Sequence, residues 1–120
     1  MKLYLQYTGE LISKNNWHTI AKNRKQIILT GKYRKFKKDL ELIFRSQAKK
    51  QAFTGPVRID LIINIKSNKD AQNIEMPVFD ALEKAGIIDN DKNIFYHTCF
   101  KQVKQKGEQE FVKLAIEEFK

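Results

Sequence analysis

Residues 57–86, VRIDLIINIKSNKDAQNIEMPVFDALEKAG, contain the clearest strand pattern of the chain and a helix pattern directly after it. Apolar and polar residues alternate over Val57–Ile65, which predicts a strand, and we place this strand at the centre of a sheet. Over Asn73–Ala85 the apolar residues recur at three- and four-residue spacing, which predicts a helix that ends at Gly86. Because Pro77 cannot donate a backbone hydrogen bond, the helix must begin close to it or bend there.

The residues before this segment predict a strand and a second helix. Residues 3–7 alternate between apolar and polar, as in a short strand with one buried face, and residues 26–29 fit a brief second strand. Thr30 is a suitable N-cap for a helix that follows it. Its apolar positions are Tyr33, Phe36, Leu40, Ile43 and Phe44, which recur at helical spacing. The lysines and arginines of this segment fall mainly on the other faces, so the predicted helix is amphipathic and has a basic side.

The residues after this segment predict a hairpin. Residues 94–103 and 111–119 both alternate, and a polar turn at Lys106-Gly107 joins them. Strands and helices mix without strict alternation along the chain, so the predicted class is α+β. We expect a small single-domain, two-layer fold over residues 1–120, with helices packed on a mixed or mostly antiparallel sheet.

The charge of the chain indicates a polyanionic partner. Its 23 Lys and Arg against 14 Asp and Glu give a net charge of +9, which favours nucleic acid. A basic surface that only keeps the protein in solution is the alternative. No apolar run approaches the length of a membrane span, and Met1–Leu5 fits a strand better than a signal peptide, so we expect a cytoplasmic protein with no membrane partner.

Acidic residues stand on both sides of the second predicted helix. Asp70 lies at the strand-to-helix junction, and Asp89 and Asp91 lie just past the helix end. Carboxylates of this kind hold Mg²⁺ in enzymes that hydrolyse phosphodiesters. Alternatively, Asp70 caps the helix and Asp89–Asp91 is an ordinary turn.

Several motifs together resemble one family. The D-x-x-N order of Asp70–Asn73, the F-D-A-L-x-K-A-G segment of Phe79–Gly86 and the acidic pair in Asp89–Asp91 resemble the RusA family of junction-resolving endonucleases, which are mostly carried by phages and prophages. Ser13–His18 resembles the family's N-terminal loop, and Leu29–Arg34 resembles its segment entering the first helix. The resemblance therefore covers most of the chain and implies a RusA-like fold.

The resemblance implies a function as well. It implies a homodimer that binds four-way DNA junctions by their structure and cuts symmetrically related strands, with Mg²⁺ (Mn²⁺ is the alternative) held by three aspartates. Asp70 and Asp91 match the first and last of these aspartates and are the expected catalytic metal ligands. Asn73 matches the family asparagine and is expected to support the site.

Two positions depart from the family pattern. Gln72 stands where the middle aspartate is expected, and Met76 stands where the family has a lysine. Gln72 still offers a neutral carbonyl oxygen to a cation, and Asp89 is a further candidate ligand. The loss of one negative charge and one cation predicts weaker metal binding and weaker cleavage.

Five residues are expected to contact DNA. Lys69 lies beside the predicted site, Arg24 and Lys35 are expected to contact phosphates, and Asn16 and Trp17 lie in the N-terminal loop. Trp17 can stack on an exposed base or pack over the edge of the sheet.

Three functions remain open from the sequence. The first is a Mg²⁺-dependent Holliday junction resolvase. The second is a branched-DNA-binding protein of the same fold that has lost cleavage, and the third is an unrelated basic RNA-binding module.

Overall fold

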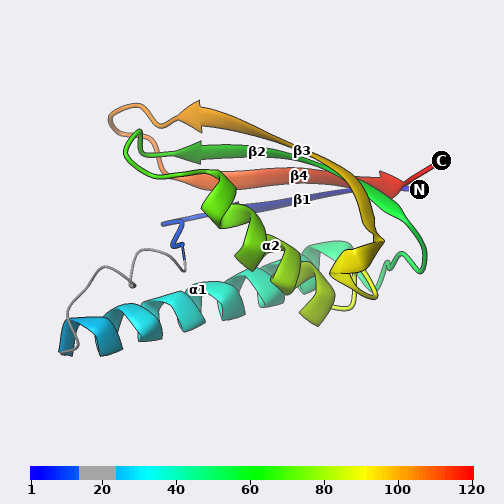
Figure 1. Ribbon diagram of the computed structural model, residues 1–120, viewed down its shortest axis with the longest axis horizontal. Helices are drawn as coiled ribbons and strands as arrows, with labels where there is room; N and C mark the ends of the chain where they lie inside the picture. Colours follow the sequence, from blue (N-terminus) through cyan, green and yellow to red (C-terminus); the bar gives the residue numbers. More distant parts are fainter. Residues whose placement is uncertain (14–23) are drawn as a thin grey trace.

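The fold has two layers, with two helices on one face of a four-stranded sheet (Figure 1). The structure, a computed structural model, describes residues 1–13 and 24–120, with only the backbone for 24–30. In chain order the elements are β1 Lys2–Thr8, α1 Arg24–Ala48, β2 Val57–Ile65, α2 Gln72–Lys84, the short 3-10 helix η2 Asp91–Asn93, β3 Ile94–Val103 and β4 Phe111–Glu118. This arrangement confirms the predicted α+β class.

The sheet is mixed, with the strand order β1-β4-β2-β3. Strand β4 runs antiparallel to both β1 and β2, whereas β2 and β3 are parallel. The prediction of a central strand at Val57–Ile65 is confirmed, because β2 has a partner on each side. Strand β3 is an edge strand and pairs with β2 alone among the described residues.

The core lies between the sheet and the two helices. Alternate residues of β1, β2 and β4 are buried, as the period of two predicts. The rings of Tyr7 on β1 and Phe36 on α1 meet edge-to-face at 5.5 Å. The fully buried side chains include Leu40, Phe44, Ile59, Leu61, Ile63, Ile74, Leu82 and Ile116.

Two predictions for the segment before α1 are wrong. Residues 26–29 are helical instead of forming a strand, and Thr30 lies inside α1 instead of capping it. The physical reason is the cooperativity of helices: once packing fixes the turns from Tyr33 to Phe44, extending the helix toward Arg24 needs no new nucleus.

The predicted hairpin of residues 94–103 and 111–119 is also wrong. Strand β2 lies between β3 and β4, and the backbone N–H of Lys104 donates to the carbonyl of Ile65 at 2.9 Å. In β4, Val112, Leu114 and Ile116 are buried, whereas β3 has no buried residue. The strand that can bury one face takes the interior place, and the exposed strand takes the edge.

Helix α2 ends as predicted and tolerates its proline. Gly86 has a φ of +77°, and its N–H donates to the carbonyl of Glu83 at 3.0 Å, which confirms the glycine C-terminus. The helix begins five residues before Pro77, so the ring removes one backbone hydrogen bond inside it. Burial of Ile74 and Val78 on the two flanking turns offsets this loss.

Candidate active site and DNA contact surface

Asp70 lies in the connection from β2 to α2 and starts the helix. Its Oδ1 accepts a hydrogen bond from the N–H of Gln72 at 3.0 Å, and its backbone carbonyl accepts from the N–H of Asn73 at 3.1 Å. The carboxylate is exposed. Asp70 therefore has the helix-capping contact considered as one alternative, and its carboxylate also faces solvent.

Asp91 lies beside the other end of α2. Its N–H donates to Oε1 of Glu83 in the last turns of the helix at 3.0 Å. Asn90 caps η2, because its side chain accepts from the N–H of Lys92 at 2.9 Å. Asp89 and Asp91 are exposed within this turn.

One chain does not bring the two predicted metal ligands together. Asp70 precedes the first residue of α2, Asp91 contacts its last turns, and the 13-residue helix between them rises about 20 Å. Gln72 lies at the Asp70 end and Asp89 at the Asp91 end. Within residues 1–13 and 24–120, no three His, Cys, Asp or Glu side chains form a group that could hold a metal ion. The described part of a single chain therefore does not fit a Mg²⁺ ion held by three carboxylates.

A buried carboxylate holds the connection that carries Asp70. Glu110, only 4% exposed, accepts hydrogen bonds from the N–H of Leu11 at 2.8 Å and from the N–H of Lys66 at 3.0 Å. Its Oε1 also lies 3.0 Å from Nζ of Lys69, which donates to the carbonyl of Leu11 at 2.9 Å. Burial alone would raise the pKa of Glu110, but these hydrogen bonds and the Lys69 charge outweigh it and lower the pKa.

This network gives Lys69 a structural contact that its sequence position did not indicate. The ammonium group that was expected to contact DNA is paired with Glu110 inside the molecule. Glu110 was not among the predicted site residues. No local pattern could have found it, because it lies far from Asp70 in the sequence and is an ordinary acidic residue of a polar segment.

Lys101 of β3 was also missed by the sequence prediction. Its Nζ donates to the carbonyl of Lys69 at 2.6 Å and to that of Ser67 at 3.1 Å. The connection before Asp70 is therefore fixed from two sides, by Glu110 and by Lys101. The basic stretch from Lys101 to Lys106 was the only signal for it in the sequence.

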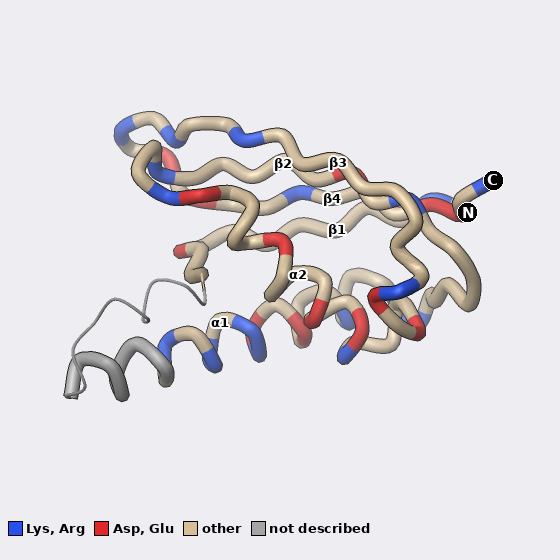
Figure 2. The backbone as a smooth tube through the Cα atoms, in the orientation of Figure 1, with Lys and Arg blue, Asp and Glu red and all other residues tan. Residues whose placement is uncertain are grey.

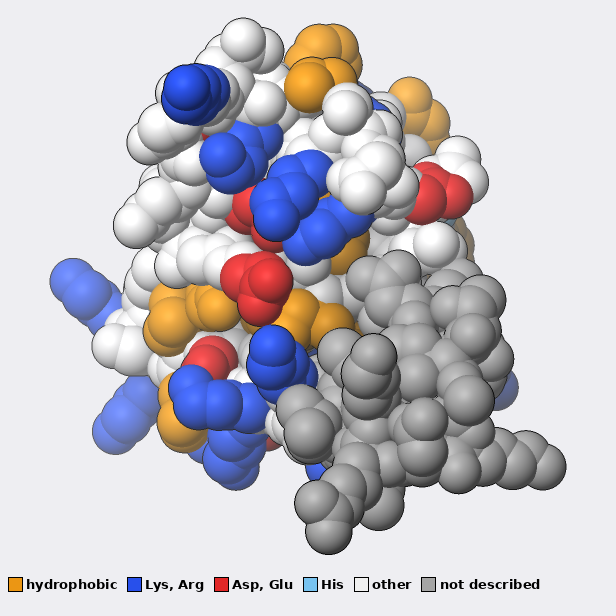
Figure 3. All heavy atoms as spheres, turned by 90° about the vertical axis from the view of Figure 1, so that its left-hand side faces the viewer, with side chains coloured by type: hydrophobic (Ala, Val, Ile, Leu, Met, Phe, Trp, Pro, Cys, Tyr) orange, Lys and Arg blue, Asp and Glu red, His pale blue; other side chains and the backbone are white. Residues whose placement is uncertain are grey.

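Lysines gather at the end of the sheet that carries Asp70. Figure 2 shows blue segments at the end of β2 and in the connection from β3 to β4, and Figure 3 shows Lys and Arg side chains on this end of the molecule with acidic side chains among them. Lys66, Lys104 and Lys106 belong to these two connections. A phosphate backbone that reaches Asp70 would therefore approach a positively charged surface.

Another group of polar side chains joins α2 to β3. Nε2 of His97 lies 2.9 Å from Oε2 of Glu75, and the His97 ring meets Phe79 edge-to-face at 5.4 Å. Cys99, two residues further along β3, is a free thiol. Burial is the main cause that raises the pKa of Cys99 to about 11. The charge of Glu75, a hydrogen bond to Glu75 and the charge of Asp70 raise this pKa further. A thiol that stays protonated is a poor nucleophile.

The other predicted DNA contacts lie on or near α1. Lys35 is exposed and pairs with Asp39 one turn later, with Nζ 3.2 Å from Oδ2. Arg24 is the first residue of α1, and only its backbone is described. Asn16 and Trp17 lie outside the described residues, so their predicted roles stay predictions.

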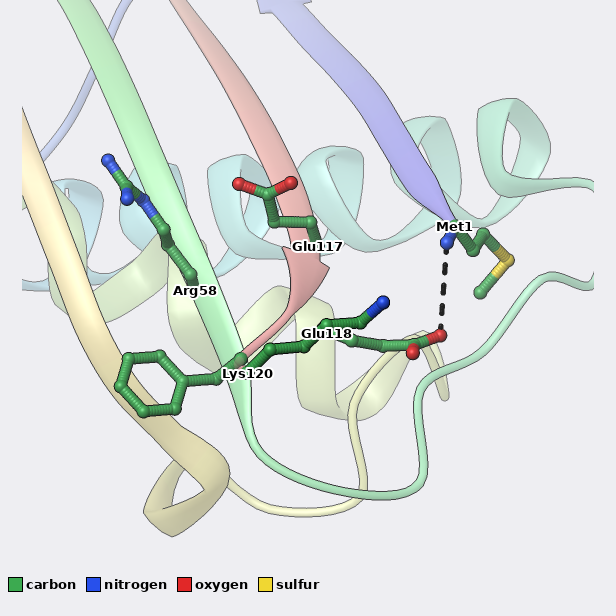
Figure 4. Close-up of a pocket in the computed structure, with 6 residues that line it drawn as sticks. Met1, Arg58, Glu117, Glu118 and Lys120 are labelled. Carbon is green, nitrogen blue, oxygen red and sulfur yellow. Dashed lines mark ion pairs between the residues drawn. The ribbon is translucent and has the colours of Figure 1, made fainter.

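A surface pocket lies at the end of the sheet opposite to Asp70. It has a volume of about 320 Å³ and is lined by Met1, Arg58, Glu117, Glu118, Phe119 and Lys120 (Figure 4). The Met1 ammonium group lies 3.9 Å from Oε1 of Glu118. This pocket is therefore separate from the Asp70 site.

Comparison with protein families decides the class of protein. The family described as endodeoxyribonuclease RusA matches residues 9–116. The chain belongs to the RusA family. Comparison with individually curated proteins gives no significant match.

Membership of the RusA family implies an endodeoxyribonuclease that acts on Holliday junctions. It confirms the resemblance inferred from the motifs and replaces the third hypothesis, an unrelated RNA-binding module. A branched-DNA partner follows from the same match. No helix of the described residues is long and apolar enough to cross a membrane.

Proposed function

We propose that this RusA-family protein cleaves four-way DNA junctions as a homodimer that requires Mg²⁺, with Mn²⁺ as a possible substitute. The observation that carries the dimer is the position of Asp70 and Asp91 at opposite ends of α2. Ligands of a divalent cation lie within about 2.6 Å of it. If both carboxylates serve one ion, they come from two different chains.

Strand β3 offers an edge for a second chain. It is ten residues long, and Lys101 is its only charged residue apart from His97, which is charged only when protonated. Soluble monomers usually protect long edge strands with charges, prolines or bulges, because an open edge pairs readily with another strand. No residue of β3 is buried, so its edge is open to a second strand.

Antiparallel pairing of two β3 edges would supply the missing carboxylate. Asp91 lies just before the start of β3, and Lys101 near its end bonds to the residue before Asp70. A two-fold axis through the middle of the strand places the start of one β3 opposite the end of the other. The partner's Asp91 then approaches Asp70, and each dimer has two equivalent sites, as symmetric cutting requires.

The lysine-rich end of the sheet is the proposed surface for the junction arms. Lys66, Lys104 and Lys106 surround the connection that carries Asp70, and Lys35 extends the basic surface along α1. Contacts of this kind position the DNA without reading its sequence.

A specific observation favours a second function, junction binding without cleavage. Gln72 and Met76 occupy the positions where the family resemblance implies an aspartate and a lysine, and Met76 is exposed beside the site. An exposed apolar side chain there provides neither a proton nor a phosphate contact.

Mixing two inactive variants tests the proposal. Asp70→Asn and Asp91→Asn are purified, mixed so that subunits exchange, and incubated with a labelled four-way junction and Mg²⁺ or Mn²⁺. Asparagine keeps the capping contact of residue 70. In a two-chain site each variant alone is inactive, but every mixed dimer has one site with both aspartates. The mixture should therefore recover about a quarter of the parent's sites and give single nicks.

The control is Glu118→Gln, which removes an exposed carboxylate at the end of the sheet opposite to Asp70 and should cleave like the parent. A mixture that stays inactive, although both variants bind the junction, rules out the two-chain site. A parent protein that binds the junction tightly but never nicks it establishes the second function instead.

A further inference from the structure

The sheet face opposite the two helices carries exposed aromatic rings. Figure 1 shows α1 and α2 on one face of the sheet. We call the other surface the open face; it consists of the alternate side chains of the four strands that lie opposite to the buried ones. Tyr4 on β1 is 69% exposed, Tyr96 on β3 is 46% exposed and Phe100 on β3 is 63% exposed. Large exposed rings on one face of a sheet favour a binding surface over a face that only contacts water.

Cations accompany these rings. Cζ of Arg58 lies 4.8 Å from the centre of the Tyr96 ring, and Nζ of Lys2 lies 5.6 Å from that of Tyr4. Arg58 is held in place by Asp60, whose Oδ2 lies 3.1 Å from its Nε. Lys113 lies between Gln6 and Ile62 in the row of residues that ends at Phe100.

We propose that the open face binds single-stranded nucleic acid, with bases stacked on Tyr4, Tyr96 and Phe100 and phosphates paired with Lys2, Arg58 and Lys113. Exposed rings on a sheet stack bases without regard to sequence, and neighbouring cations neutralise the backbone. The inference goes beyond junction cleavage, because it concerns unpaired strands and a surface away from Asp70.

The spacing of the rings fits an extended strand. Tyr96 and Phe100 are four residues apart on β3, about 13 Å along the strand, and β1 lies three strand spacings, about 14 Å, from β3. Each ring is therefore placed for a separate base. The pocket beside Arg58 leaves open space at this end of the face (Figure 4).

Charge favours nucleic acid over a second copy of the chain on this face. Cores of protein interfaces are depleted of charged residues, whereas this face carries Lys2, Arg58, Asp60, Lys113 and Glu117. The three cations outnumber the two carboxylates, so the face has a net charge of +1. The same excess attracts a polyanion.

The test measures binding of fluorescent oligodeoxythymidylate by anisotropy at several salt concentrations. Tyr96→Ala and Phe100→Ala should each weaken binding about fivefold or more, since one stacked base is lost, and should leave the salt dependence unchanged. Arg58→Gln should reduce the salt dependence, because one phosphate contact is removed. The matched control is Phe95→Ala, an equally exposed ring on β3 that packs against Phe119 and not on a cation; it should bind like the parent.

Unchanged affinity of a Tyr96→Ala/Phe100→Ala double variant with a parent-like circular dichroism spectrum overturns the proposal. An equal loss of oligonucleotide affinity in Phe95→Ala also overturns it. So does a change of the double variant from dimer to monomer in sedimentation, because the open face would then be a contact between two copies of the chain. Asp70→Asn should keep its affinity for the oligonucleotide. Failure of junction cleavage and failure of strand binding are therefore read in separate assays.

Discussion

Nζ of Lys69 lies 3.0 Å from Oε1 of Glu110, and this ion pair joins the connection that carries Asp70 to the start of β4. The glutamate is buried and the lysine is largely covered. Because the same carboxylate also accepts from the backbone of Leu11 and Lys66, three separate segments depend on one side chain. Lys69, which the sequence predicted to contact DNA, thus helps to hold Asp70 in place.

Replacing Glu110 should lower stability. Glu110→Gln leaves the Lys69 ammonium partly buried without its counter-charge, and we expect the free energy of unfolding to fall by about 2–4 kcal/mol. Urea unfolding followed by circular dichroism measures the change. In the matched control, Glu108→Gln, an exposed residue keeps an oxygen that can accept from the N–H of Gln105, and the change should stay below about 0.5 kcal/mol. Equal stability of the two variants would show that the buried pair contributes nothing.

The stabilisation by Glu110 should depend on pH. Its pKa in the folded protein is lowered from the ordinary value of 4.5, so the folded state favours the ionised form. This contribution is present in full above the unfolded pKa and is lost as the pH falls through the folded pKa. The difference in unfolding free energy between the parent and Glu110→Gln should therefore shrink from about pH 7 to about pH 3. A difference that is constant over this range would contradict the assignment.

Local sequence patterns predicted which segments form helices and strands better than they predicted which strands lie side by side in the sheet. The alternation of β2 and the spacing of α2 indicated the correct structures, because each reflects one buried face. The same alternation in β3 could not show that it lies at the edge beside β2, since strand order depends on which strands can bury more surface. The apolar run of residues 26–29 was too short to distinguish strand from helix.

The candidate site was predictable only in part. The motifs identified the family, and the structure places Asp70 and Gln72 at the start of α2. The distance between Asp70 and Asp91 was not predictable from their separation of about twenty residues, because it depends on α2 running back along β2. The Lys69–Glu110 pair links residues 41 positions apart, which no local pattern reveals.

Cys99 should react slowly with alkylating agents. A pKa of about 11, against the ordinary 9.0, reduces its thiolate fraction about a hundredfold at neutral pH. Glu75→Gln removes the charge that helps to raise this pKa, and alkylation by iodoacetamide should become faster. Mass spectrometry of timed samples gives both rates. Glu108→Gln serves as the control, and a rate in Glu75→Gln no faster than in this control would show that Glu75 does not protect the thiol.

Placing an aspartate at residue 72 and a lysine at residue 76, as the family resemblance implies, should raise cleavage. Gln72 is the first residue of α2, and Met76 is exposed one turn later on the same side. An aspartate at the start of the helix is favourable with respect to the helix dipole, so Gln72→Asp/Met76→Lys should fold normally. The double variant has a second carboxylate beside Asp70 and a cation close to it. We expect its junction cleavage rate to rise about tenfold or more, measured by gel electrophoresis of a labelled four-way junction.

The control for this double variant is Gln51→Asp/Leu42→Lys. It makes the same change of charge at two exposed positions, one within α1 and one just after it. If the control rises equally, the gain comes from general charge; if neither rises while both bind the junction, Gln72 and Met76 do not limit cleavage.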